Sequence, residues 1–153
     1  MEKFLRLLNE MEEAIPLAEK LSEKVSKSSI GWHIQHNLLV ISVIIDALKR
    51  SDPSLYKWTF SLPRLLVYTF GSIPRGRSKA PKVVQPVTDW KIDQLKQEMR
   101  AIKERYKELD ALAPNAFFKH PYFGHVKLKP ARRFLAIHTE HHLKIIREII
   151  NKK

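Results

Sequence analysis

Two histidines stand at positions of a predicted helix where apolar side chains would be expected. The segment from Arg133 to Ile150 follows a helical pattern, and its apolar stripe includes Leu135 and Ile145. The stripe also passes through His138 and His142, which lie one turn apart on the same helix face. Two imidazoles in this arrangement can bind one metal ion. The spacing therefore predicts a metal site that faces the protein interior.

A third histidine in a similar setting occurs earlier in the chain. His36 lies on a line with Val40 and Val43 along a second predicted helix, and His33 precedes it by about one turn. A lone histidine in such a position is usually a core residue with hydrogen-bonded nitrogens. The side chain of Trp32, beside these residues, is expected to pack in the fold rather than to have a functional role. The residues alone leave the choice between His33 and His36 open.

Other polar residues near these positions could also contribute to the site. His141 points about 100° away from His142 around the helix, so we expect it on the surface or in contact with a ligand residue. Glu140 also faces away, so the zinc-protease arrangement of an HExxH helix does not apply. His120 belongs to the segment His-Pro-Tyr-Phe-Gly. It is either part of a surface turn with aromatic anchors, or a residue at the mouth of the site that contacts a substrate.

The composition limits the chemistry that is available. The chain of 153 residues contains no cysteine, so disulfides and thiolate ligands are excluded and a metal must bind histidine, aspartate or glutamate. The length suits a single domain over residues 1–153. The first residues include acids where a signal peptide needs an apolar run, and the apolar run 38–45 is too short to span a bilayer. We therefore expect a soluble cytoplasmic protein without a membrane partner.

The net charge of +12 is concentrated in two stretches without acids. Residues 53–88 contain six basic residues, and residues 111–139 contain five. We do not expect nucleic acid as a partner, because no basic helix face, RNA-binding signature or helix-turn-helix pattern is present. The stretches are either a solubilising surface or a local anion site. The residues expected to hold an anionic substrate are Lys119, Lys129, Arg132 and Arg133, whereas Arg75 and Arg77 should lie at the opposite end unless their segment folds back.

Four long helical segments dominate the pattern. They cover residues 3–25, in which Pro16 should kink or divide the helix, then residues from Ser28 or Ser29 as a cap to Arg50, from Asp89 as a cap to Leu112, and from Pro130 to Asn151. The connection 51–88 contains five prolines and a short predicted helix over 62–70. No segment alternates with the period of a strand. The pattern predicts an all-α fold, an up-and-down four-helix bundle with a long connection between its second and third helices.

Alternating helix directions would make the second and fourth helices parallel. His36 lies about two turns into the second helix, and His138 lies about two turns into the fourth. The two histidines would then lie at the same level, near the same end of the bundle. This topology therefore predicts that the imidazoles converge.

Three segments together resemble the DinB/YfiT-like superfamily of metal-binding helical bundles. They are Ser29–Leu38, His120–Gly124 and His138–His142, in this order along the chain. The nearest resemblance is to a branch with a His-Pro-Phe-Phe-Gly type of loop. The resemblance implies a divalent ion on His36, His138 and His142. Many members continue with Arg-Gly-Gln after the last of these histidines, whereas this chain continues with Leu-Lys-Ile.

The superfamily includes thiol transferases and hydrolases, so the resemblance implies a metal-dependent enzyme of one of these classes. Zinc is the default ion, and nickel, cobalt, manganese or iron would accept the same ligands. We expect a small-molecule partner, either an anionic substrate or a low-molecular-weight thiol, and the sequence also admits a homodimer. Candidates for the general base are His120, Glu12 and Glu13. The alternative is a non-catalytic helical bundle that binds a small molecule or an anion.

Overall fold

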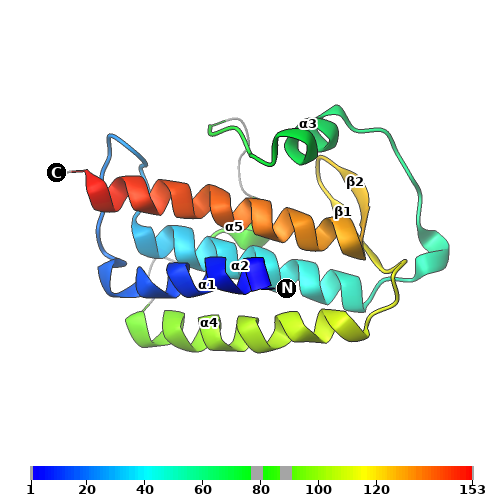
Figure 1. Cartoon of the computed structure of the whole chain (residues 1–153), viewed down its shortest axis with the longest axis horizontal. Helices are drawn as coiled ribbons and strands as arrows, with labels where there is room; N and C mark the ends of the chain where they lie inside the picture. Colours follow the sequence, from blue (N-terminus) through cyan, green and yellow to red (C-terminus); the bar gives the residue numbers. More distant parts are fainter. Residues whose placement is uncertain (1, 77–80, 87–90, 153) are drawn as a thin grey trace.

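Long helices run lengthwise through the molecule, and a short helix and a strand hairpin lie against them (Figure 1). The computed structural model describes residues 2–76, 81–86 and 91–152. Within these residues the long helices are α1 (Glu2–Glu13), α2 (Ile30–Lys49), α4 (Ile92–Lys107) and α5 (Leu128–Asn151), and the short helix is α3 (Leu62–Phe70). The described connections contain 3-10 helices, namely η1 (Ile15–Leu17), η2 (Pro53–Leu55), η3 (Lys82–Val84) and η4 (Glu108–Ala111).

The chain also forms a two-stranded antiparallel sheet, so the prediction of an all-α four-helix bundle is wrong. Strand β1 (Phe117–His120) pairs with β2 (Gly124–Lys127), and β1 contacts both α2 and α5. Each strand has four residues, which is too short for an alternating pattern to be recognised in the sequence. Phe117 and Phe118 are adjacent and both buried, which hides the strand period further.

α2 and α5 pack side by side in opposite directions. The contacts between them pass from His33 with His142 to Asn37 with Thr139, so one residue number rises as the other falls. Figure 1 shows the same arrangement, with the end of α5 beside the start of α2. The expected parallel packing of these two helices is therefore wrong.

α2 and α4 run in the same direction, which explains the long connection between them. Arg105 of α4 bonds to Asp46 of α2, and farther along both helices Lys49 bonds to Glu108. The helix directions are thus up, down, down and up, rather than alternating (Figure 1). Because α2 and α4 begin at the same end, the chain between them must return along the length of a 20-residue helix, about 30 Å.

The returning chain folds over α5 and α2 instead of remaining at one end. Arg75 makes two hydrogen bonds of 2.8 Å to the carboxylate of Glu148 on α5. Farther on, η3 contacts α2, where the Val84 carbonyl meets His36. The segment of Arg75 therefore folds back, which was the alternative to its expected place at the far end. Arg77 lies outside the described residues.

Local capping chemistry sets several helix boundaries. Ser29 caps α2 by accepting a hydrogen bond of 3.3 Å from the backbone N–H of Trp32. Pro16 lies in η1 just after α1, which ends at Glu13. Residues 18–29 form no helix, so the prediction of a first helix that continues to residue 25 is wrong. Pro130 lies in the first turn of α5, where the missing N–H has no helical partner to lose. The sequence predicted the Ser29 cap and the first-turn position of Pro130 correctly.

The remaining helix predictions are met in part. The short helix expected over 62–70 is confirmed as α3. The third long helix was expected over 89–112, and the structure has α4 followed by the 3-10 helix η4, which ends at Ala111. Its expected cap, Asp89, lies outside the described residues.

The core lies between the four long helices. α5 contacts α1 and α2, and α4 contacts the same two helices, which closes the arrangement around one interior. The predicted stripe of α5 faces this interior, since Leu135, Ile145 and Ile149 are buried. α2 is apolar on most faces because it packs between α4 and α5. No helix in the described part of the chain is long and apolar enough to cross a membrane.

The turn of the hairpin provides a test of this packing. Gly124 has a φ of +69°, and a Cβ there would lie 2.3 Å from Thr59 Oγ1, whereas Gly71 has a φ of +61° and open space around it. We predict that Gly71→Ala lowers the free energy of unfolding by about 1 kcal/mol, the conformational cost alone. Gly124→Ala should cost at least about 1 kcal/mol more, because the chain between η2 and α3 must move. Denaturant unfolding measures the free energy of unfolding of both variants. Equal losses would show that the Thr59 side chain moves aside without a cost in stability.

Candidate metal centre

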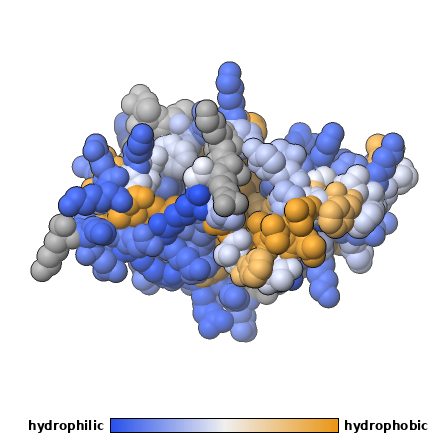
Figure 2. Space-filling view, turned by 90° about the horizontal axis from the view of Figure 1, so that it is seen from above, coloured by the Kyte–Doolittle hydropathy of each residue, from blue (hydrophilic) through white to orange (hydrophobic). Residues whose placement is uncertain are grey.

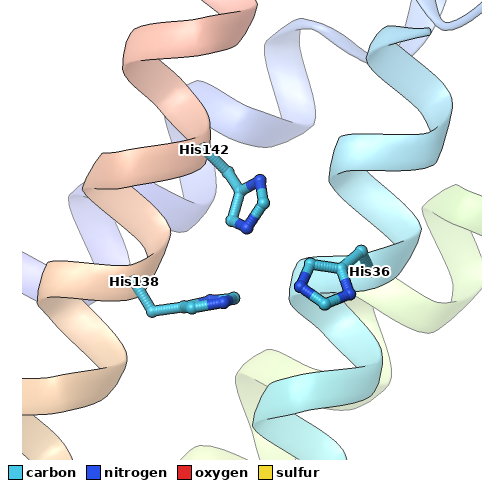
Figure 3. Close-up of side chains that lie close together, drawn as sticks. All are labelled: His36, His138 and His142. Carbon is cyan, nitrogen blue, oxygen red and sulfur yellow. The ribbon is translucent and has the colours of Figure 1, made fainter. Parts of the chain in front are cut away.

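Three imidazoles from two helices meet inside the molecule. α2 supplies His36, and α5 supplies His138 and His142 (Figure 3). Each offers one ring nitrogen, and these nitrogens lie within 4.8 Å of one another. The three residues are 6%, 9% and 6% exposed. The prediction that these histidines converge is confirmed, with His36 rather than His33 as the third member.

The imidazoles meet for a different reason from the one expected. In parallel helices they would have met through equal depth near one end. In the observed antiparallel pair, His36 lies in the first half of α2 and His138 lies near the middle of the longer helix α5. Their level is set by how far α2 and α5 are offset along each other, and the sequence pattern does not define that offset.

The Nδ1 atoms of two ligand candidates face oxygens that can only accept a hydrogen bond. His36 Nδ1 lies 2.7 Å from the Val84 carbonyl oxygen, and His138 Nδ1 lies 2.9 Å from Asn37 Oδ1. Both imidazoles therefore carry their proton on Nδ1. Their Nε2 lone pairs are then available to a metal ion. Metal-binding histidines in proteins are oriented in this way, with the second ring nitrogen donating to a protein acceptor.

His142 has an imidazole as its partner. Its Nδ1 lies 3.0 Å from His33 Nδ1, and His33 Nε2 lies 3.0 Å from Ser26 Oγ. If His142 donates from Nδ1, then His33 Nδ1 accepts, and the N–H of His33 Nε2 donates a hydrogen bond to Ser26 Oγ. In this arrangement the Nε2 lone pair of His142 also faces the common space. His33 thus orients a ligand and does not belong to the group of three.

The triangle of nitrogens is wider than the one that an ion requires. Two nitrogens at about 2.0–2.1 Å from one ion lie about 2.8–3.4 Å apart in octahedral or tetrahedral geometry. The observed separation extends to 4.8 Å. Rotations within the side-chain rotamer wells move a ring nitrogen by about 1 Å. The rings can therefore close around an ion without a change in the helices.

Burial keeps these imidazoles neutral. Desolvation lowers the pKa of His36, and it holds the pKa values of His138 and His142 well below the usual range for histidine. Positive charge on neighbouring histidines lowers the latter two pKa values further. Only the neutral imidazole has a lone pair for a metal. The site is thus ready to bind a cation at neutral pH.

His120 lies close to the site but outside the group of three. Its Nδ1 accepts hydrogen bonds from the backbone N–H groups of Tyr122 and Phe123 at 3.1 and 3.2 Å, and its ring stacks on Phe123. Phe134 lies between His120 and His138, with ring centroids 4.9 and 5.7 Å from theirs. Burial lowers the pKa of His120 to about 4, which does not favour the role of general base suggested by the sequence. The aromatic turn anchors this histidine firmly.

The far side of His142 is bordered by the returning connection. His141 is half-buried and hydrogen-bonds the backbone of Ile73. A small cavity of about 70 Å³ lies beside it, and its lining includes Arg75 and Lys144. Positive charge on Arg75 contributes to the lowered pKa values of both His33 and His141. Arg75 is therefore a cation near the centre that the sequence had not placed there.

Two of the basic residues expected to hold an anionic substrate are engaged elsewhere. Arg132 forms a salt bridge of 2.7 Å with Asp110, and Arg133 donates to the backbone carbonyl of Tyr68. Lys119 and Lys129 are exposed on the hairpin and the first turn of α5. These contacts tie the start of α5 to its surroundings. They do not form an anion site at the three histidines.

The expected carboxylate bases also lie elsewhere. Glu12 makes a salt bridge of 2.5 Å with Lys103. Glu140, which was expected to face away from the histidines, pairs with Arg147 at 2.8 Å. Glu13, at the end of α1, is exposed. The group that could hold a metal consists of imidazoles alone among the described residues. Its chemistry is therefore that of neutral nitrogen ligands in a buried site.

Two residues important to the site were missed by the sequence analysis. Asn37 is fully buried and contacts both His138 and Thr139, with its amide nitrogen 3.2 Å from Thr139 Oγ1. An asparagine within a long apolar helix is a signal that could have pointed to it. Val84 contributes a backbone carbonyl, which no side-chain pattern can reveal. Trp32 packs as expected, stacked on His36 with centroids 5.0 Å apart.

Comparison with known proteins does not assign this chain to a family or a function. Comparisons with protein-family models, with curated proteins and with solved structures find no match to this chain. The resemblance of the three segments to the DinB/YfiT-like superfamily therefore stays a prediction. The candidate site is defined by its geometry alone.

The buried histidines predict how stability depends on pH. The pKa of His33 is lowered to about 4, chiefly by desolvation, as is that of His120, whereas an unfolded histidine titrates near 6.5. Between these values the unfolded chain binds protons that the folded chain does not, so the free energy of unfolding falls as pH falls. One such shift corresponds to about 3 kcal/mol. Denaturant unfolding of chelator-treated protein from pH 7 to 4 should show this loss, and His33→Gln should reduce its slope. A flat profile down to pH 5 would contradict it.

Proposed function

We propose that this protein is a metal-dependent enzyme of the hydrolase or thiol-transferase class, with a divalent ion on His36, His138 and His142. The main support is that each Nδ1 atom already has a protein partner while the three candidate ligand atoms lie together. Three protein ligands are typical of catalytic sites, whereas structural zinc sites have four. Zinc is the first choice of ion, and nickel, cobalt, manganese and iron suit the same ligands.

The chain's own residues would orient the ligands and restrict water around them. Trp32 stacks on His36, and Asn37 fixes the ring of His138. A bound ion would supply Lewis acidity, which lowers the pKa of a water molecule or of a thiol. The first effect supports hydrolysis, and the second supports transfer to or from a thiol. A small anionic substrate or a low-molecular-weight thiol fits this chemistry.

His120 is the candidate catalytic residue in this proposal. Because its Nδ1 accepts two backbone hydrogen bonds, its proton is on Nε2. With a pKa of about 4 it is neutral at pH 7, so it suits a hydrogen-bond donor to substrate better than a proton carrier. The ring of Phe134 contacts the rings of both His120 and His138, which supports the closeness of His120 to the centre.

The resemblance to the DinB/YfiT-like superfamily supports the same three ligands and the same two reaction classes. It enters the proposal as a likeness of three short segments, residues 29–38, 120–124 and 138–142. The cytoplasmic location and the homodimer expected from the sequence remain predictions.

A second candidate function is binding without catalysis. The observation that favours it is the absence, among the described residues, of a carboxylate in the group of three histidines. The low pKa of His120 points the same way, since it does not suit proton transfer near neutral pH. The protein would then use the ion to bind a small anion or to stabilise its fold.

Metal content tests the site itself. We predict about one divalent ion per chain in tag-free protein loaded with zinc and then dialysed, because three ligands converge. His138→Ala should bind at least about tenfold more weakly, and His125→Ala, a histidine of β2 outside the group, should bind as wild type. Elemental analysis and titration with a competing chelator give both numbers. Equal affinity of wild type and His138→Ala would refute this site.

A chemical readout separates the two candidate functions. With zinc-loaded protein and activated esters or thiol acceptors as substrates, we predict turnover that His142→Ala abolishes. His120→Gln should lower kcat by about 10–100-fold with metal content and melting temperature unchanged, because a substrate hydrogen bond is lost. Unchanged kinetics in this variant would return His120 to the role of a turn anchor. No turnover with any substrate by a fully loaded protein would favour the binding function.

A further inference from the structure

α3 turns an apolar side outward. Successive residues of an α-helix are 100° apart, so Leu62, Leu65, Leu66 and Phe70 form one continuous arc of this nine-residue helix. These side chains are 54%, 52%, 46% and 72% exposed. Val67 on the other side is the buried residue of α3. The helix therefore presents to solvent the type of face that helices normally bury.

Polar contacts hold α3 in this orientation. On its inner side, Arg64 donates to the Phe123 carbonyl at 3.0 Å, and the Tyr68 hydroxyl donates to the Pro130 carbonyl at 2.7 Å. Ser61 caps the helix by accepting from the Arg64 backbone N–H. The hydrogen bonds on the inner side orient the apolar arc outward. An apolar face that is fixed outward in this way is typical of an interaction surface.

The apolar surface extends beyond the helix. Trp58 and Phe60, in the segment just before α3, are 67% and 69% exposed. We call this surface the α3 patch, and it comprises Trp58, Phe60, Leu62, Leu65, Leu66 and Phe70. Figure 2, which looks down on this side of the molecule, shows apolar side chains gathered there. A groove of about 490 Å³ opens into the patch, and its lining includes Trp58, Phe60 and Leu65 of the patch together with Tyr56, Arg64 and Lys127.

The charged residues of the segments that form and border the α3 patch are all basic. The patch belongs to the stretch 53–88, and the neighbouring hairpin and start of α5 belong to the stretch 111–139, neither of which contains an acid. Lys57 is exposed within the same segment as Trp58. The Arg64 guanidinium lies 5.8 Å from the ring of Trp58, and Lys127 Nζ lies 4.5 Å from the ring of Tyr56. A matching partner must therefore be both apolar and negatively charged.

We propose that the α3 patch binds the surface of a membrane that contains anionic lipids. Its exposed apolar side chains would enter the boundary between headgroups and acyl chains, and the exposed residues Lys57 and Lys127 would face the anionic headgroups. A second copy of the chain is a poor match, because two such patches would bring like charges together. A small ligand in the groove would leave Leu62, Leu66 and Phe70 exposed, because these residues do not line it. The expectation of no membrane partner rested on the lack of a spanning segment, and surface binding needs none.

Vesicle binding tests the proposal independently of the metal site. The full chain is sedimented with vesicles of phosphatidylcholine alone and of phosphatidylcholine mixed with phosphatidylglycerol. It should bind the anionic vesicles more tightly, and binding should weaken as salt rises. The double variant Leu65→Gln/Phe70→Gln should lower the partition coefficient by at least about tenfold, since two large apolar side chains no longer insert. The matched control is Leu21→Gln, an exposed leucine before α2, which should bind as wild type.

Charge is tested with a second matched pair. Lys57→Gln should weaken binding to anionic vesicles, whereas Lys24→Gln, at an exposed position before α2, should not. All substituted side chains are exposed, so circular dichroism and melting temperature should stay unchanged. Failure to bind anionic vesicles, or equal binding to both vesicle types, would overturn the proposal. So would concentration-dependent self-association without vesicle binding that Leu65→Gln/Phe70→Gln removes, and this result would assign the patch to a second copy.

Discussion

The hydrogen bond on the Nδ1 atom of each buried imidazole is the interaction on which the site depends. An imidazole that is taken out of water needs a partner for each nitrogen, and the partner on one nitrogen decides what the other can do. The Val84 carbonyl and Asn37 Oδ1 fix the tautomers of His36 and His138. His33 can fix the tautomer of His142 only while Ser26 Oγ accepts a hydrogen bond from His33 Nε2. Burial then keeps the rings neutral, so their remaining lone pairs can act as ligands together.

The direction of the helices explains how one of these acceptors reaches the site. Because α2 and α4 are parallel, the chain between them must return along the molecule, and it returns over the histidines. Arg75 attaches this connection to α5 through Glu148, and His141 bonds to Ile73. The connection then reaches η3, whose Val84 carbonyl meets His36. A segment that looks like a linker in the sequence thus completes a buried hydrogen-bond network.

The sequence predicts what depends on local periodicity and fails where longer-range geometry decides. The stripe through His138 and His142, the Ser29 cap and the helix at 62–70 follow from spacing and capping chemistry. The depth argument predicted that His36 and His138 meet, but it used a wrong topology, because the sequence of a single segment does not define the direction of its helix. The hairpin strands are too short to show a period. The roles of Val84 and Asn37 depend on contacts across the fold, which a linear pattern does not contain.

The tautomers of the histidines test the central claim most directly. Long-range ¹H–¹⁵N correlation spectra of the chelator-treated protein distinguish a proton on Nδ1 from one on Nε2. We predict that His36 and His138 carry their proton on Nδ1, and that added zinc shifts the Nε2 resonances of these two residues and of His142 while the Nδ1 protons remain. Nε2-protonated rings at His36 and His138, or zinc-induced shifts confined to other histidines, would contradict the account.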